Sequence, residues 1–272
     1  MGHDPAARIA RFRALHASGI FVIANAWDAG SARVLAGLGF EAIATSSGAM
    51  ANTLGRIDGQ VTRDEAIEHG RTLVDAVEVP VAADLENGFG EKPEDAALTI
   101  RRAIAVGLAG GSIEDFSGDE AKAIYPVSLA AERVQAAADA ARTSGFVLTA
   151  RAENFLHGRA DLDDTILRLQ AFEKAGADVL FAPGLPSIEA VRTVCTAVSK
   201  PVNFMVAIRG KSFSMAELAD AGVRRVSVAG SLYRAAMGGL LGAAREIRET
   251  GTFTYLDSAA PGAELARFMR KE

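Results

Sequence analysis

Short apolar runs alternate along this chain with longer amphipathic stretches that are rich in alanine and leucine. Short apolar runs bounded by turn residues are typical of buried strands, whereas apolar positions three and four residues apart predict helices. The pattern predicts strands at residues 21–27, 41–47, 80–86, 110–115, 146–153, 177–183, 201–206 and 224–230. It predicts helices at residues 6–17, 63–77, 94–106, 129–143, 162–175, 188–198 and 232–248.

Eight strands that alternate with helices predict a closed, parallel (β/α)₈ barrel, the TIM-barrel fold of the α/β class. An open, doubly wound sheet is the competing architecture. It usually has fewer strands, and no G-x-G-x-x-G sequence follows the first predicted strand. We therefore expect one barrel domain over residues 1–272, in which residues 252–272 form an additional C-terminal tail with a helix at 262–270.

The composition adds a few limits to this picture. The chain has 272 residues, of which 49% are hydrophobic, and this is enough for one large domain with a sizeable core. A net charge of −5 gives no reason to expect nucleic acid or a membrane surface as a partner. The chain has a single cysteine, Cys195, and no signal-peptide pattern or long uncharged apolar run, so we expect a cytoplasmic protein.

The candidate chemistry gathers where the predicted strands end, because active sites of such barrels lie at the C-terminal ends of the strands. Asp84 and Glu86 end the third strand, and strand alternation would point both carboxylates to the same side. Two glycines in the segment that follows, Asn87-Gly88-Phe89-Gly90, allow a sharp turn. Such a strand end suits Mg²⁺, which prefers oxygen ligands and keeps several waters, although a solvated polar turn is the simpler interpretation.

Other strand ends and their loops extend this acidic cluster. Asp58 and Glu114 would join Asp84 and Glu86 at one mouth of the barrel, where Arg151 is the only basic residue at a strand end in this group. This excess of negative charge favours a divalent cation. Each residue also has a structural interpretation: Asp58 as a turn residue, Glu114 as a cap, and Arg151 as a partner in an internal salt bridge to Glu153 or Glu114.

Several motifs in chain order resemble the isocitrate lyase / phosphoenolpyruvate mutase superfamily. They are Asn25-Ala26-Trp27-Asp28, Thr45-Ser46-Ser47-Gly48, Leu54-Gly55 with Asp58, Asp84-Leu85-Glu86-Asn87-Gly88-Phe89-Gly90, Ser112-Ile113-Glu114-Asp115 and Thr149-Ala150-Arg151. The resemblance implies a (β/α)₈ barrel in which Asp84, Glu86 and Glu114 bind Mg²⁺, or alternatively Mn²⁺, largely through waters.

The resemblance also implies roles for the other candidates. Asp58 corresponds to an active-site aspartate, and Arg151 corresponds to the arginine that stabilises an oxyanion. The segment containing Thr45, Ser46 and Ser47 corresponds to the part that holds the substrate carboxylate, and Trp27, Gly48 and Asn203 are expected to contact the substrate as well. Family members act on C–C or P–C bonds next to a 2-oxo acid through enolate-type intermediates. They are usually tetramers in which the terminal helix is swapped between subunits.

Two departures from the family pattern bear on the reaction. The lyases carry a K-[KR]-C-G-H signature after the fourth strand, but here residues 116–122 contain no cysteine. Gly184 follows Pro183 where the lyases place a glutamate. We therefore expect a Mg²⁺-dependent lyase or decarboxylase that acts on a small 2-oxo or hydroxy carboxylic acid. P–C bond chemistry and a non-catalytic carboxylate-binding role are the alternatives. The loop at 116–128, which offers few residues to pack, is predicted to close over the mouth.

Overall fold

Eight parallel strands form a closed barrel in the computed structural model, which describes residues 4–270. Each strand pairs with its neighbour in sequence, and β1 and β8 close the circle. The strands are β1 (Phe21–Asn25), β2 (Ile43–Ala44), β3 (Val81–Asp84), β4 (Gly110–Glu114), β5 (Val147–Arg151), β6 (Val179–Phe181), β7 (Val202–Met205) and β8 (Arg225–Ser227). The (β/α)₈ TIM barrel predicted from the sequence is therefore confirmed, and each strand lies inside its predicted segment.

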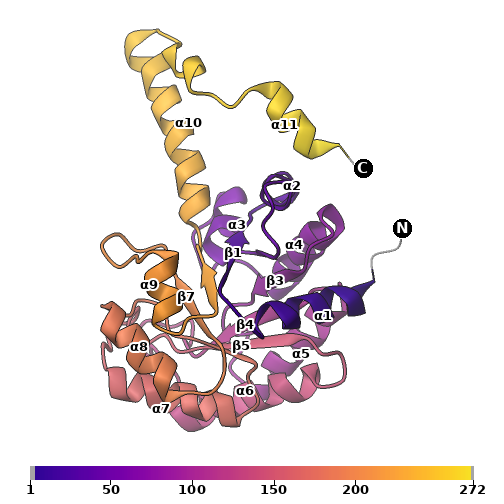
Figure 1. Cartoon of the computed structure of the whole chain (residues 1–272), viewed down its shortest axis with the longest axis vertical. Coiled ribbons are helices and arrows are strands. Elements are labelled where there is room, and N and C mark those ends of the chain that lie inside the picture. Colours follow the sequence, from indigo (N-terminus) through magenta and orange to yellow (C-terminus); the bar gives the residue numbers. More distant parts are fainter. Residues whose placement is uncertain (1–3, 271–272) are drawn as a thin grey trace.

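Helices surround this barrel (Figure 1). They are α1 (Pro5–Leu15), α2 (Ala29–Gly37), α3 (Ser47–Thr53), α4 (Arg63–Ala76), α5 (Pro93–Ala105), α6 (Val127–Ala141), α7 (Leu162–Lys174), α8 (Ile188–Ala197), α9 (Met215–Asp220), α10 (Ser231–Thr250), the 3₁₀ turn η1 (Thr254–Asp257) and α11 (Gly262–Met269). The sequence analysis did not predict α2, α3 and α9, which are too short for a strong periodic signal. Their N-caps Asp28, Ser46 and Ser214 are the local signals that could have indicated them.

The N-terminal end of the barrel is closed by α1. The Phe12 side chain is completely buried there and packs edge-on against Phe21 at the start of β1. Gly110 opens β4 at the same level, and a Cβ at this position would lie 2.6 Å from the Phe12 ring, so the contact requires glycine. Because α1 covers this end, a ligand must enter the barrel from the opposite end, where the strands terminate.

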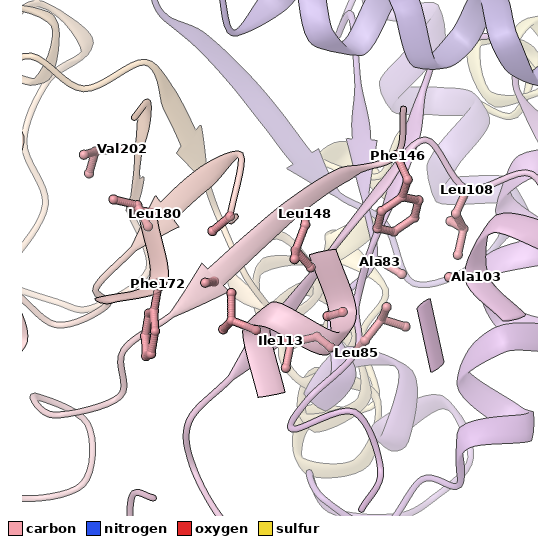
Figure 2. Packing of buried hydrophobic residues seen from close by; sticks show 14 of the residues in the cluster. Ala83, Leu85, Ala103, Leu108, Ile113, Phe146, Leu148, Phe172, Leu180 and Val202 are labelled. Carbon is pink, nitrogen blue, oxygen red and sulfur yellow. The ribbon is translucent and has the colours of Figure 1, made fainter. Parts of the chain in front are cut away.

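A second apolar layer lies between the strands and the outer helices. Figure 2 shows Leu85, Ile113, Leu148 and Phe172 packed in this layer. Many helix positions in the layer are alanines, including Ala96, Ala103 and Ala137. Small side chains allow helices to lie close to the sheet, and this packing holds the strand ends in fixed positions.

The C-terminal part of the chain leaves the barrel. Helix α10 projects away from it, and the chain returns through η1 to α11 beside α2 (Figure 1). Phe268 of α11 contacts Gly37, and Arg33 of α2 donates a 2.9 Å hydrogen bond to the Met269 carbonyl. The predicted tail 252–272 thus contains the expected helix, while its last two residues lie outside the described part.

None of the helices in residues 4–270 combines the length and the apolar character that a membrane span would need.

Candidate active site

The ends of three adjacent strands place the main charged residues side by side. Asp84, Glu114 and Arg151 are the last residues of β3, β4 and β5. Glu114 and Arg151 are direct partners in the strand register, and Asp84 pairs with Ser112, two residues before Glu114. The parallel register of the barrel brings these side chains to one mouth, as the sequence predicts.

Arg151 is the cation around which this mouth is organised. Its guanidinium lies 3.3 Å from Glu114, 3.7 Å from Asp84 and in closer contact with Glu153. It also lies over the Phe181 ring, 5.2 Å from the centroid. Although burial opposes protonation, the three carboxylates hold the pKa of Arg151 above its usual value, so the residue stays positive. The salt bridges to Glu153 and Glu114, which the sequence left open as an alternative, are therefore both present.

The environment of Glu114 disfavours its charged form. Burial raises the pKa of Glu114 well above its usual value, and the neighbouring acidic groups add to the effect although Arg151 opposes it. One guanidinium therefore does not compensate the whole acidic cluster, and protons or a further cation must carry the remaining charge.

The hydroxyls after β2 hold Asp84 in place. Ser47 donates to the Asp84 carboxylate over 3.0 Å, and the Asp84 backbone N–H donates to Thr45 Oγ1 over 2.9 Å. The neighbouring Ser46 is the N-cap of α3, where its hydroxyl accepts from Ala49. These three residues thus orient Asp84 and the start of α3.

Asp58 reaches the same place from the loop before α4. Although the residue as a whole is exposed, its carboxylate lies against Gly48, where an added Cβ would come within 3.1 Å of Oδ2. Partial burial, followed by the charge of Asp84, raises the pKa of Asp58, while a hydrogen bond from Ser47 opposes the shift. Asp58, Gly48, Ser47 and Asp84 therefore form one contiguous group at the mouth.

The strand-alternation argument for Glu86 is wrong. Strand β3 ends at Asp84, and Glu86 has a φ of 47°, in the left-handed region. The chain bends because the Glu86 carbonyl accepts from Glu114 N and Leu85 closes a turn with Gly88. Glu86 still interacts with the cluster, since burial and then Asp84 and Asp58 raise its pKa to about 8.

The mouth leads into a cavity of about 60 Å³ inside the barrel. Of the predicted site residues, Thr45, Ser46, Asp84, Arg151 and Asn203 line this cavity. Trp27 does not line this cavity, and its ring meets Tyr233 edge-on at 5.5 Å while its carbonyl accepts from His69. Asn203 lies deeper than the charged residues and bonds to Arg225 and Ser227.

Sequence reasoning did not predict the buried network behind Arg151. Glu153 has a side chain that is only 2% exposed, and besides Arg151 it approaches His157 at 3.5 Å. Its backbone N–H donates to Asp115, which pairs with Arg168 of α7 at 3.0 Å. The local signals were the two-residue spacing of Arg151 and Glu153 and the four-residue spacing of Glu153 and His157. Asp115 and Arg168 join the network only through the tertiary fold.

The connection after β4 makes more packing contacts than expected. It ends at Pro126 because α6 begins at Val127, and Phe116 and Ile124 form an antiparallel bridge. Ile124 and Tyr125 are buried, and the Phe116 ring stacks on His157 at 3.8 Å. The expectation that this loop has little to pack is therefore wrong for Phe116, Ile124 and Tyr125, and residues 118–122 form its longest exposed stretch.

The acidic mouth offers oxygen ligands without a preformed metal cage. Within residues 4–270, no group of three or more His, Cys, Asp and Glu side chains converges closely enough to ligate a metal ion directly. Asp84, Glu86 and Glu114 supply carboxylate oxygens near this mouth, since, in addition to burial, Asp84 raises the pKa of Glu86 and both raise the pKa of Glu114.

These features define a TIM barrel with an acidic mouth and a single arginine among its strand-end carboxylates. The sequence model of the phosphoenolpyruvate phosphomutase family matches residues 12–248, so the chain belongs to this family. Its relatives also include lyases and decarboxylases of the isocitrate lyase / phosphoenolpyruvate mutase superfamily, as the resemblance suggested.

Three similar proteins illustrate the range of these relatives. A crystal structure from Burkholderia cenocepacia J2315, of a candidate lyase or mutase, has 49% identity and a TM-score of 0.96, covering 98% of this chain and 97% of its own. Oxaloacetate decarboxylase 1 of Pseudomonas putida is 29% identical over 83% of this chain and 80% of its own length. The 2-methylisocitrate lyase of Escherichia coli is 33% identical over 60% of this chain and 57% of its own length.

Proposed function

We propose that this protein is a Mg²⁺-dependent enzyme that acts on a small 2-oxo or hydroxy carboxylic acid through an enolate-type intermediate, as a C–C lyase or decarboxylase. The observation that carries this proposal is the charge balance at the mouth. Asp58, Asp84, Glu86 and Glu114 gather around one guanidinium that Glu153 already engages. Carboxylates crowded in this way favour a bound divalent cation.

The donor set fits a hydrated Mg²⁺ ion. Asp84, Glu86 and Glu114 supply only carboxylate oxygens, which are the ligands that Mg²⁺ prefers, and the absence of a direct three-ligand group in residues 4–270 suits an ion that keeps its waters. When bound, such an ion would supply Lewis-acid stabilisation of negative charge on the substrate. Mn²⁺ has the same ligand preference and is the alternative.

The chain's own residues support the remaining steps. Arg151 stays positive and lies at the mouth of the cavity, where it would stabilise an oxyanion that develops on the substrate. Thr45 and Ser46 line the same cavity and would hold the substrate carboxylate. Asp58 forms no ion pair within residues 4–270, so its carboxyl group is free to carry the proton that the cysteine carries in the lyases.

P–C bond chemistry is the second candidate, because the family model that matches the chain describes a phosphomutase. A phosphoryl group would need several cations near the loop after β4. The exposed part of that loop contains a single lysine, Lys122, which is already paired with Glu91 at 3.2 Å. This pairing favours a carboxylate substrate over a phosphonate.

Turnover measurements test the proposal directly. We would assay the metal-free protein, then the protein with added Mg²⁺, against 2-oxo acids, malates and phosphonates. We expect Mg²⁺-dependent turnover of a carboxylic acid by the wild type and no turnover by Asp84→Ala. The control variant is Asp139→Ala, which changes an exposed residue of α6 paired with Arg142 and should turn over the same acid. Exclusive turnover of phosphonopyruvate would support the second candidate, and no turnover of any compound would argue against both.

We also propose that the protein is a homo-oligomer, with a tetramer as the family expectation. Helix α10 has no buried residue in the described chain, and its Leu240, Leu241 and Ile247 are exposed. Apolar side chains on a helix that projects from the barrel are typical of a surface that packs on another subunit. Light scattering coupled to size-exclusion chromatography would show a single mass near 28.4 kDa if this proposal is wrong.

A further inference from the structure

The turn that follows β3 has a strained backbone. Glu86, Gly88 and Phe89 have positive φ values of 47°, 81° and 58°, and only one of the three is a glycine. Other residues rarely adopt this left-handed conformation, because their Cβ comes too close to the backbone. Such a conformation persists only where the surrounding structure holds it in place. The groups that hold this turn therefore determine where Glu86, one of the three proposed Mg²⁺ ligands, is located.

Every backbone carbonyl of residues 85–90 accepts a hydrogen bond. The Leu85 carbonyl accepts from Gly88 N over 2.8 Å, and the Glu86 carbonyl accepts from Glu114 N over 2.9 Å. The carbonyls of residues 87–90 accept from side chains of the helices α4, α5 and α6. The shape of the turn thus depends largely on side chains that lie far away in the sequence.

Arg133 of α6 holds both ends of the stretch that accepts from side chains. Its guanidinium donates to the carbonyls of Asn87, of Gly90 over 2.8 Å and of Lys92 over 3.2 Å. The residue is only 1% exposed, and its guanidinium lies over the Tyr125 ring, 4.7 Å from the centroid. Burying a cation is costly unless polar groups compensate it, and here the turn carbonyls do so. Arg133 and the turn therefore stabilise each other.

The middle of the turn is held from two other helices. Arg63 of α4 donates to the carbonyls of residues 88 and 89 over 3.2 and 2.9 Å, and Thr99 of α5 donates to the first of these over 2.7 Å. Neither side chain donates to the carbonyl of the residue directly after Glu86, which accepts from Arg133. Arg133 is thus the side-chain donor that bonds to this turn nearest to the proposed ligand.

We infer that Arg133 is a positioning residue of the proposed Mg²⁺ site: it holds the turn after β3 in its left-handed conformation and thereby fixes the position of Glu86. This inference rests on the proposed function, in which Glu86 is a ligand of the ion. Arg133 does not line the cavity, so it acts through the turn. Removing a group that orients a metal ligand typically lowers metal affinity about 10- to 100-fold.

Titration calorimetry with Mg²⁺ tests this role. We expect Arg133→Met, which removes all of the donors, to bind Mg²⁺ about 10-fold more weakly than the wild type. Arg133→Lys should lie between the two, about threefold weaker than the wild type, because lysine keeps the charge and a donor but loses the planar fork.

Arg8→Met is the matched control, because Arg8 of α1 is also a buried arginine that donates to backbone carbonyls. Its acceptors, Val74 and Val77, lie at the end of α4, on the closed side of the barrel. This change should lower the stability of the fold, as measured by urea unfolding. It should leave the Mg²⁺ affinity within about twofold of the wild-type value, since the mouth is not altered.

A double-mutant cycle shows whether Arg133 acts through Glu86. Glu86→Gln should weaken Mg²⁺ binding in the wild-type background, because it removes a proposed ligand. In the Arg133→Met background the same change should have an effect at least about threefold smaller, since the carboxylate is no longer held in place. Additive effects of the two changes would overturn the inference.

Three further outcomes would also show that the inference is wrong. In the first, every Arg133 variant that folds binds Mg²⁺ as tightly as the wild type. In the second, Arg8→Met weakens Mg²⁺ binding as much as Arg133→Met does. In the third, neither Arg133 variant folds by circular dichroism, because the arginine then serves the barrel as a whole. Wild-type protein that does not bind Mg²⁺ would instead contradict the proposed function itself.

Discussion

Acidification should destabilise this protein through His16, which lies just after α1 at the closed end of the barrel. The residue is only 8% exposed, and its Nδ1 lies 2.8 Å from the Phe12 carbonyl. Because a carbonyl can only accept, Nδ1 carries the proton, and Nε2 presents its lone pair to Arg225. Protonation of Nε2 would remove this acceptor and place two cations next to each other.

The pKa of His16 gives the size of the effect. Burial, followed by the charge of Arg225, lowers this pKa from 6.5 to about 3. Between these two values the unfolded chain binds more protons than the folded one, so the free energy of unfolding rises with pH. The contribution is fully present above pH 6.5 and is lost as the pH falls toward 3, with a loss of about 2 kcal/mol at pH 5 and about 3 kcal/mol at pH 4.

The variant His16→Gln isolates this contribution, because glutamine can accept from Arg225 but does not titrate. We would measure urea unfolding of both proteins at pH 7.5, 5 and 4. The difference in free energy of unfolding, wild type minus variant, should fall by about 2 kcal/mol between pH 7.5 and 5, since the titration of all other groups cancels in the difference. His157→Gln is the sign control: hydrogen bonding to Glu153 raises the pKa of His157, so its contribution is present at low pH and is lost as the pH rises.

Parallel pH profiles for wild type and His16→Gln would refute this reasoning. A direct NMR titration of the histidine side chains would be equally decisive. If all of the imidazoles titrate near pH 6.5, His16 is not held neutral. In that case the hydrogen-bond assignment between His16 and Arg225 would also be wrong.

Three further predictions concern the site. Asp84→Ala removes a proposed ligand and should abolish Mg²⁺ binding measured by calorimetry. The barrel should still fold, as measured by circular dichroism, because the change relieves repulsion among the carboxylates. Unchanged Mg²⁺ affinity would contradict the metal assignment. Cys195→Ser should leave turnover nearly intact, since Cys195 packs beside Gly222 and burial raises its pKa to about 11. If thiol reagents inactivate the enzyme and bound substrate prevents this inactivation, Cys195 has a catalytic role. The loop 116–128 should become protected from hydrogen exchange when Mg²⁺ and oxalate bind, with the largest change at the exposed residues 118–122. Equal exchange in the free and the ligand-bound protein would exclude a gating role.

The sequence by itself determined the barrel and the set of chemical groups at its mouth. Apolar runs that must be buried on both faces predict parallel strands covered by helices, and this local pattern does not depend on long-range contacts. The sequence pattern also predicted that Asp84, Glu114 and Arg151 lie at the same mouth of the barrel. This holds because each is the last residue of its strand and parallel strands end on the same side.

The tertiary structure decided how those groups are paired. Glu86 lies beyond the end of β3 in a left-handed turn, so its position depends on a hydrogen bond to Glu114 and not on strand alternation. Arg225 and His16 are more than 200 residues apart in sequence, and only closure of β8 against β1 and α1 brings them together. Their pKa values arise from burial and neighbouring charge, and only the folded chain defines these quantities.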